Sequence, residues 1–98
     1  MPMMILITYD VETSTPEGAR RVRHVAKECQ NYGQRVQNSV FECVLTEAQF
    51  VKLRNKLASM IDDVKDSVRF YFMGNSWNRK VEFIGKKTCY DVTSELII

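Results

Sequence analysis

The feature that most constrains the fold is an apolar run near the N-terminus, from Met3 to Tyr9, which ends directly in Asp10. Nearly every position of the run is apolar, so both faces of the strand that it predicts should be buried. Such a strand belongs in the middle of a sheet. The acid that follows it is therefore either a turn residue or a group with a chemical task.

The size and composition of the chain limit its class. Its 98 residues allow one domain, and 45% hydrophobic residues are enough for one small core. No apolar run approaches the roughly 18 residues that a membrane span needs. The opening MPMMILITY lacks a basic region and meets an acid at once, which is not typical of a signal peptide. We therefore expect a cytoplasmic protein without a membrane partner.

A first helix is predicted after a polar loop over residues 10–15. Thr15 is the expected N-cap and Pro16 the first helical residue, while Gly33 is the expected C-terminal breaker. Apolar residues at spacings of three and four form the expected core stripe. These residues are Ala19, Val22, Ala26 and Cys29.

The middle of the chain predicts a strand pair followed by a second helix. Residues 34–45 are rich in Val and Phe and read as extended, but twelve residues are long for one strand, so Asn38-Ser39 is a candidate break. Thr46 and Gln49 have the spacing of a capping box. The apolar arc expected on the helix that follows consists of Phe50, Leu53, Leu57, Ile61 and Val64.

The last third of the chain predicts two further strands, at residues 67–73 and 80–84, joined by a turn over 74–79. The order of elements is that of an α+β, ferredoxin-like (βαββαβ) sandwich with an extra C-terminal strand. We expect one domain over residues 1–98. Within it, residues 80–98 should dock as a strand and apolar tail at the sheet edge or on a partner subunit.

The predicted sheet has an uncovered face. Two helices can cover only one side, whereas the central strands are apolar on both. A second copy is the simplest cover, so we predict a two-fold homodimer with sheets packed face to face.

Basic residues gather in two segments although the net charge is only +2. In the first segment, Arg20, Arg23 and Lys27 recur at helical spacing beside the core stripe. The second segment spans residues 79–87. Such clustering fits a polyanionic partner, or else a solvated surface. The three cysteines lack metal-site spacing and are expected to be reduced thiols.

Most catalytic constellations are absent from the sequence. There is no Gly-rich phosphate loop and no G-x-S-x-G motif, and the single histidine, His24, is expected on a helix surface. Asp10 remains, either as a turn acid or as a metal ligand. One carboxylate alone is a poor metal site, but a two-fold axis near this strand end would bring two copies of Asp10 together. Such a pair suits Mg²⁺, which takes one or two carboxylates and keeps several waters.

The stretches "ILITYDV" and "QRVQNSVFEC", with the Arg-rich helix start between them, resemble the small CRISPR-associated core protein of the adaptation module, the partner of the spacer integrase. The resemblance runs from Met3 to Met73 and continues weakly to the tail. It implies a ferredoxin-like homodimer in which Asp10 faces its mate as the catalytic, Mg²⁺-binding acid. It also implies an endonuclease acting on double-stranded DNA or single-stranded RNA.

The resemblance further implies roles for other residues. Tyr9, Arg35 and Phe41 match family positions near the active centre, with Arg35 as a phosphate contact and Phe41 as either packing or a base-stacking platform. Ser39 orients a water or phosphate, or is only a strand hydroxyl. The remaining expected nucleic-acid contacts are Arg20, Arg21, Arg23 and Lys27, of which Arg21 and Arg23 match approximately, because the preceding loop is longer here.

Three functions stay open from the sequence. The first is a Mg²⁺-dependent endonuclease with the Asp10 pair as its site, and the second is a non-catalytic DNA-binding scaffold for the spacer integrase. The third is a ferredoxin-like regulator that binds a small ligand at its dimer interface. The sequence does not decide between RNA and DNA. If the dimer closes off the two copies of Asp10, the site needs a hinge motion to work, and the hinge is expected at residues 74–79.

Overall fold

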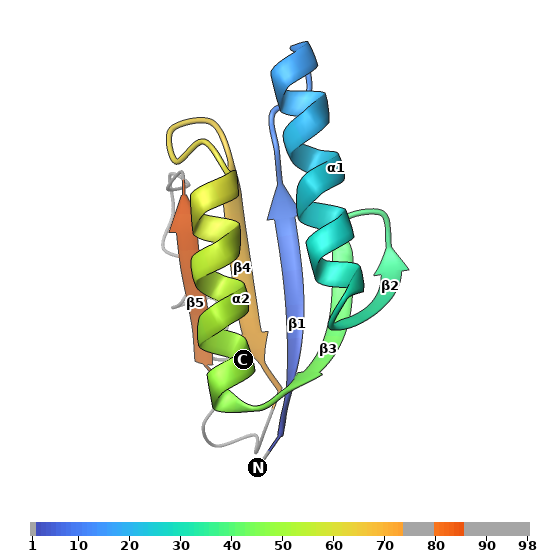
Figure 1. Ribbon diagram of the computed structural model, residues 1–98, viewed down its shortest axis with the longest axis vertical. Helices are drawn as coiled ribbons and strands as arrows, with labels where there is room; N and C mark the ends of the chain where they lie inside the picture. The colour runs from blue at the N-terminus through green and yellow to red at the C-terminus, as the bar shows by residue number, and fades with distance from the viewer. Residues whose placement is uncertain (1, 74–79, 86–98) are drawn as a thin grey trace.

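The apolar N-terminal run forms the central strand of a five-stranded antiparallel sheet in the computed structural model, which describes residues 2–73 and 80–85 (Figure 1). The strands are β1 (Met3–Asp10), β2 (Gly33–Gln37), β3 (Val40–Leu45), β4 (Ser67–Phe72) and β5 (Lys80–Gly85). The helices are α1 (Pro16–Gln30) and α2 (Glu47–Met60). The sheet order is β2-β3-β1-β4-β5, which confirms the α+β sandwich with an extra strand beside β4.

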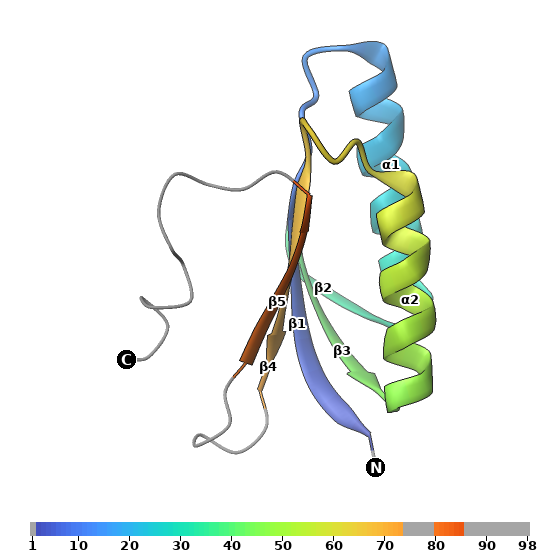
Figure 2. The ribbon, with the colours of Figure 1, turned by 90° about the vertical axis from the view of Figure 1, so that its left-hand side faces the viewer.

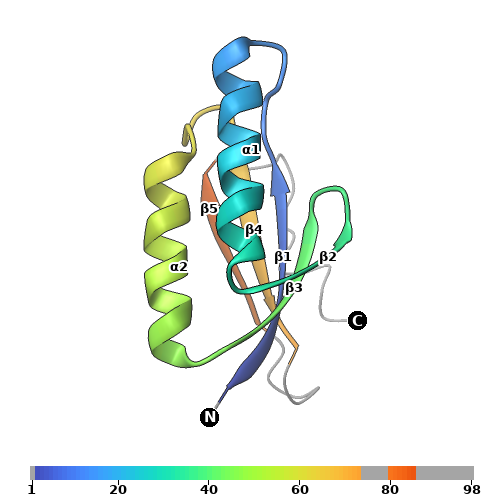
Figure 3. The same ribbon diagram turned by 45° about the vertical axis from the view of Figure 1, so that its right-hand side comes forward.

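Both helices pack on one face of the sheet, and they run antiparallel to each other (Figures 2 and 3). Strand β1 therefore has a helix-covered face and a face without helices, which we call the open face. Ile5, Ile7 and Tyr9 are buried on the covered face, whereas Met4 on the open face is 42% exposed. The expected burial is confirmed on the covered face. On the open face Met4 is exposed in the single chain, so burial there stays a prediction that depends on a second copy.

The local signals that were predicted to start the helices are present. The Thr15 Oγ1 accepts a hydrogen bond from the Gly18 amide at 3.1 Å. At α2, the Gln49 amide donates to Thr46 Oγ1 at 3.2 Å, and the Thr46 amide donates to Gln49 Oε1 at 2.9 Å. Each bond satisfies an amide that the first helical turn leaves without a partner.

One predicted helix end and one residue of a predicted apolar arc are wrong. Helix α1 ends at Gln30 with Asn31 as its C-cap, and Gly33 instead begins β2. A Cβ at Gly33 would overlap the Cys43 sulfur and the Glu42 carbonyl oxygen, so close strand packing explains this glycine. Helix α2 ends at Met60, and Val64 is 72% exposed instead of continuing the apolar arc.

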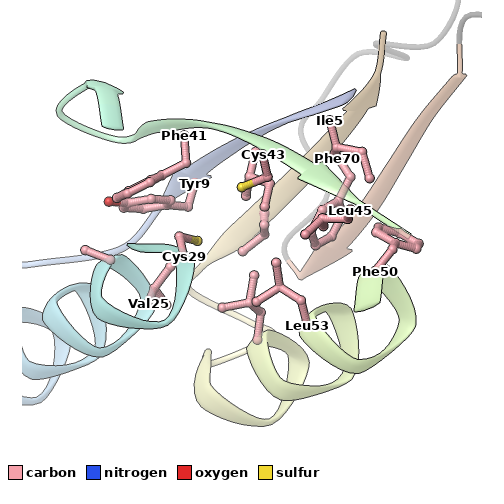
Figure 4. Packing of buried hydrophobic residues seen from close by; sticks show 14 of the residues in the cluster. Ile5, Tyr9, Val25, Cys29, Phe41, Cys43, Leu45, Phe50, Leu53 and Phe70 are labelled. Carbon is pink, nitrogen blue, oxygen red and sulfur yellow. The ribbon is translucent and has the colours of Figure 1, made fainter. Parts of the chain in front are cut away.

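The core lies between the helices and the covered face (Figure 4). From α1 it receives Val25, which the predicted stripe omitted, together with Ala26 and Cys29. From α2 it receives Phe50, Leu53 and Leu57, as predicted. Phe50 meets the edges of two strand aromatics, Phe70 at 5.3 Å and Phe72 at 5.0 Å between ring centroids.

The break predicted at Asn38-Ser39 is confirmed as the turn between β2 and β3. The predicted strand at residues 80–84 is also confirmed, because β5 pairs with β4 along its whole length. The predicted hinge at 74–79 and the apolar tail after residue 85 lie outside the described residues. Within the described residues, neither helix is long and apolar enough to cross a membrane.

Candidate functional site

Asp10 is the last residue of β1 and lies on the open face, because its neighbour Tyr9 is buried on the covered face and side chains alternate along a strand. Its side chain is exposed, and no hydrogen bond or ion pair to its carboxylate is formed by the residues described. Asp10 pairs in register with Ser67 of β4, and Ser67 in turn pairs with Gly85 of β5. The candidate acid is thus free to bind a ligand.

The open face around Asp10 combines apolar and polar side chains. Arg69 lies on the same face of β4, two residues beyond Ser67, and its register partner is Thr8. The Arg69 guanidinium lies over the Phe83 ring at 5.6 Å from its centroid, and its Nε is buried without a hydrogen-bond partner among the residues described. The sequence reasoning missed Arg69, although its alternation with Val68 and Phe70 placed it on the open face.

Tyr9, Arg35 and Phe41, which were predicted to lie near the active centre, are on the covered face of the sheet. Tyr9 stacks on Phe41 with ring centroids 6.1 Å apart, and the Arg35 guanidinium carbon lies 5.3 Å from the centre of the Phe41 ring. The Tyr9 hydroxyl donates to the Asn38 carbonyl at 3.2 Å. The structure therefore brings Tyr9, Arg35 and Phe41 together, but on the face opposite to Asp10.

These placements change what the aromatic pair can do. Phe41 is fully buried, so its ring packs in the core rather than offering a surface to a base. Burial raises the pKa of Tyr9, although the neighbouring Arg35 opposes this shift, so the phenol stays neutral near pH 7. Ser39 is half-buried in the turn, and its carbonyl oxygen accepts a hydrogen bond from the Tyr9 amide at 3.1 Å. That bond ties the turn to the end of β1.

The helix cations divide into two groups. Arg20, Arg23 and Lys27 are exposed on α1, as a phosphate-binding flank requires. Arg21 is instead paired with Asp66, its Nε lying 2.7 Å from Oδ2. The predicted contact of Arg21 with nucleic acid must therefore compete with an internal ion pair.

Asp66 is a buried charged residue that no sequence pattern indicated. It is fully buried in the segment between α2 and β4, yet it ends a run of charged residues that resembles an ordinary surface loop. Burial alone would raise its pKa. The hydrogen bonds from Arg21 and from the amides of Asp62 and Glu12 outweigh burial and lower the pKa, so the carboxylate is charged at neutral pH.

The two described cysteines are free thiols inside the core. Burial raises the pKa of Cys29 to about 12 and that of Cys43 to about 11, so neither is a thiolate at neutral pH. Among the residues described, no three His, Cys, Asp or Glu side chains gather into a metal-binding group. A metal held at Asp10 therefore needs ligands from outside this part of one chain.

Comparison with known proteins assigns the family. The family model described as CRISPR associated protein Cas2 matches residues 3–81. The chain belongs to the Cas2 family. The CRISPR-associated endoribonuclease Cas2 of Chlorobaculum tepidum is 55% identical over 96 residues, covering 98% of this chain and 100% of that one. The CRISPR-associated endonuclease Cas2 of Halalkalibacterium halodurans is 55% identical over 95 residues, covering 97% and 99%.

A solved structure extends the agreement to the fold. The crystal structure of Streptococcus pyogenes Cas2 at pH 6.5 superposes with a TM-score of 0.71 at 59% identity, over 76% of this chain and 90% of that chain. The resemblance drawn from the sequence motifs is thereby confirmed. This chain is a member of a family whose curated relatives carry endonuclease names.

Proposed function

We propose that this Cas2-family protein is a Mg²⁺-dependent endonuclease that cleaves phosphodiester bonds of double-stranded DNA or single-stranded RNA, with Asp10 as its catalytic acid. The observation that carries the proposal is the exposed Asp10 carboxylate, which has no partner among the residues described and stands at the end of the central strand. An acid held by a buried strand is fixed in place while its carboxylate stays open to a ligand.

The proposal requires a second copy of the chain on the open face. That face exposes large apolar side chains, with Met4 42% and Val44 57% exposed, which favours association with another apolar surface. A two-fold axis near the end of β1 would place two copies of Asp10 together. We therefore propose a homodimer with the sheets face to face and one composite site.

The donor set fits Mg²⁺ only in that composite form. Asp10 supplies a hard oxygen ligand, and two such carboxylates with waters and a phosphate oxygen make a reasonable Mg²⁺ site. When bound, Mg²⁺ would offset the charge of the scissile phosphate and lower the pKa of a bound water. The chain's own part at this site is to hold the two carboxylates in position.

A second function is favoured by the placement of the cations. Arg20, Arg23 and Lys27 lie on the helix layer, whereas Asp10 lies on the open face of the sheet. A duplex held along the helices would not have to reach Asp10. This arrangement supports a non-catalytic, dimeric DNA-binding scaffold for the spacer integrase in the CRISPR adaptation complex.

The cellular setting is proposed on the same grounds. Free, buried thiols at Cys29 and Cys43 suit a reducing compartment, so we place the protein in the cytoplasm. Its partners there are a second copy of the chain, DNA or RNA, and the spacer integrase.

Cleavage by the Asp10→Asn variant decides between the two functions. Wild type and variant are purified identically and incubated with duplex DNA or single-stranded RNA, in Mg²⁺ or in EDTA, and their dimer state is measured by sedimentation. Cleavage by the wild type in Mg²⁺ only, with a folded and dimeric but inactive variant, supports the endonuclease and identifies the substrate. Equal cleavage by both proteins refutes the role of Asp10. Tight, salt-sensitive DNA binding without cleavage supports the scaffold.

A further inference from the structure

The buried carboxylate of Asp66 joins four hydrogen bonds from three segments of the chain. Its Oδ1 accepts from the Glu12 amide at 3.0 Å and from Arg21 Nη2 at 3.3 Å. Its Oδ2 accepts from Arg21 Nε at 2.7 Å and from the Asp62 amide at 2.8 Å. Four donors on two oxygens satisfy a fully buried carboxylate, which would otherwise be strongly destabilising.

These hydrogen bonds join segments that adjoin Asp10 in the chain and in the sheet. Glu12, which donates its amide to Asp66, follows Asp10 by two residues along the chain. Ser67, the next residue after Asp66, is the register partner of Asp10 in the sheet. The strand end that carries Asp10 is thus held on both sides by groups anchored to one carboxylate.

The same carboxylate binds the Arg21 side chain. Its guanidinium binds Asp66 through Nε and Nη2, and its charge is offset by a buried carboxylate. The neighbouring cations Arg20 and Arg23 are exposed instead. A cation engaged in this way adds little to the release of counterions from a nucleic acid.

We propose that Arg21 and Asp66 form a positioning pair that fixes the Asp10 carboxylate for metal binding, and that Arg21 acts through Asp66 rather than on phosphate. This inference rests on the proposed function of Asp10. Removing Arg21 leaves Asp66 buried without its countercharge, so the segment around Glu12 must move or the acid must take up a proton. Groups that orient a metal ligand typically change metal affinity or activity by about 10–100-fold.

The first test compares Arg21→Met with the matched control Arg23→Met on the same helix. Binding to a DNA duplex is measured in EDTA at several salt concentrations, which makes the readout independent of cleavage. Loss of a phosphate contact lowers the slope of log K against log salt by about one. We expect that decrease for Arg23→Met and an unchanged slope for Arg21→Met. A slope lowered equally in both variants would make Arg21 a phosphate contact and overturn the inference.

The second test follows Asp10 directly. In proteins labelled with carbon-13 at the aspartate carboxyl, the Asp10 signal is followed during titration with Mg²⁺. We expect Arg21→Met and Asp66→Asn each to raise the half-saturating Mg²⁺ concentration by about 10-fold or more. The double variant should be no worse than either single one, because both act on the same pair. The double variant also removes the unpaired buried charge, so it serves as the folded reference if a single variant unfolds.

The outcomes separate this inference from the proposed function. A wild type that binds Mg²⁺ at Asp10 but cleaves no nucleic acid refutes the endonuclease and leaves the positioning pair to be judged by the titration. An Asp10 titration in folded Arg21→Met that matches the wild type overturns the positioning pair, whatever the activity. Cleavage lowered by about 10–100-fold in Arg21→Met, with the DNA salt slope retained, supports both.

Discussion

The burial of Phe41 leads to a prediction that separates packing from nucleic-acid recognition. In Phe41→Ala the core loses a fully buried ring that stacks on Tyr9. Removing a buried Phe typically costs about 3–5 kcal/mol, of which an aromatic pair accounts for about 0.5–1.5 kcal/mol. A domain of this size has a free energy of unfolding of about 5–15 kcal/mol, so the variant loses a large share of its stability.

Urea unfolding followed by far-ultraviolet circular dichroism measures this loss. With a denaturant dependence of about 2 kcal/mol per molar, we expect the midpoint of Phe41→Ala to fall by about 2 M. The matched control is Val51→Ala on α2, where the side chain is 49% exposed, and it should stay within about 0.5 kcal/mol of the wild type. All proteins are compared at one concentration, because dimer formation adds to the apparent stability.

One result would refute the packing argument. If Phe41→Ala unfolds at the wild-type urea concentration and binds single-stranded RNA much more weakly, the ring contributes to a nucleic-acid surface and not to the core. Unchanged RNA binding by the folded fraction of a destabilised variant supports the burial that the structure shows.

Two further predictions concern the sheet end near Asp66. Gly85 has a φ of +101°, and a Cβ there would overlap the Asp66 carbonyl oxygen. We therefore expect Gly85→Ala to lower the free energy of unfolding by about 2–4 kcal/mol in urea melts, and a change below about 0.5 kcal/mol would contradict the described path of β5. The second prediction concerns the stability of the fold at acid pH. Because folding lowers the Asp66 pKa from its ordinary value of 3.8, the charged carboxylate stabilises the fold above that pH, and this contribution is lost as the pH falls through the lowered value. The difference in unfolding free energy between the wild type and Asp66→Asn, measured by urea melts from pH 7 to pH 3, should become smaller below pH 3.8. A difference that stays constant over this range would show that Asp66 does not cause the loss of stability in acid.

Local signals carried most of the fold prediction. The caps at Thr15 and Thr46 and the break at Asn38-Ser39 are short-range patterns, and a few neighbouring residues decide them. The apolar run of β1 also supported a longer-range prediction, namely that β1 is the central strand of the sheet. These features were predictable because the physics that produces them lies within one segment of sequence.

The errors arose where a distant segment decides the outcome. Gly33 is required by its close approach to β3, which no residue near it in sequence reveals. Asp66 is buried because Arg21 meets it from another element, and a buried acid with its cation looks like two surface charges in the sequence. The exposed Asp10 was found because it ends an apolar strand, whereas its separation from Tyr9 and Phe41 followed only from the faces of the sheet.

The central place of β1 also determines when the site can exist during synthesis. Strand β1 is made first, yet its partners β3 and β4 come from the middle and the last third of the chain. Contacts between segments so distant in sequence form slowly, and they must wait until the later strands have left the ribosome. Asp10 meets Ser67 only at that stage, so a nascent chain carries the acid without the scaffold that positions it. The topology thus delays the proposed nuclease until nearly all of the described sheet has been translated.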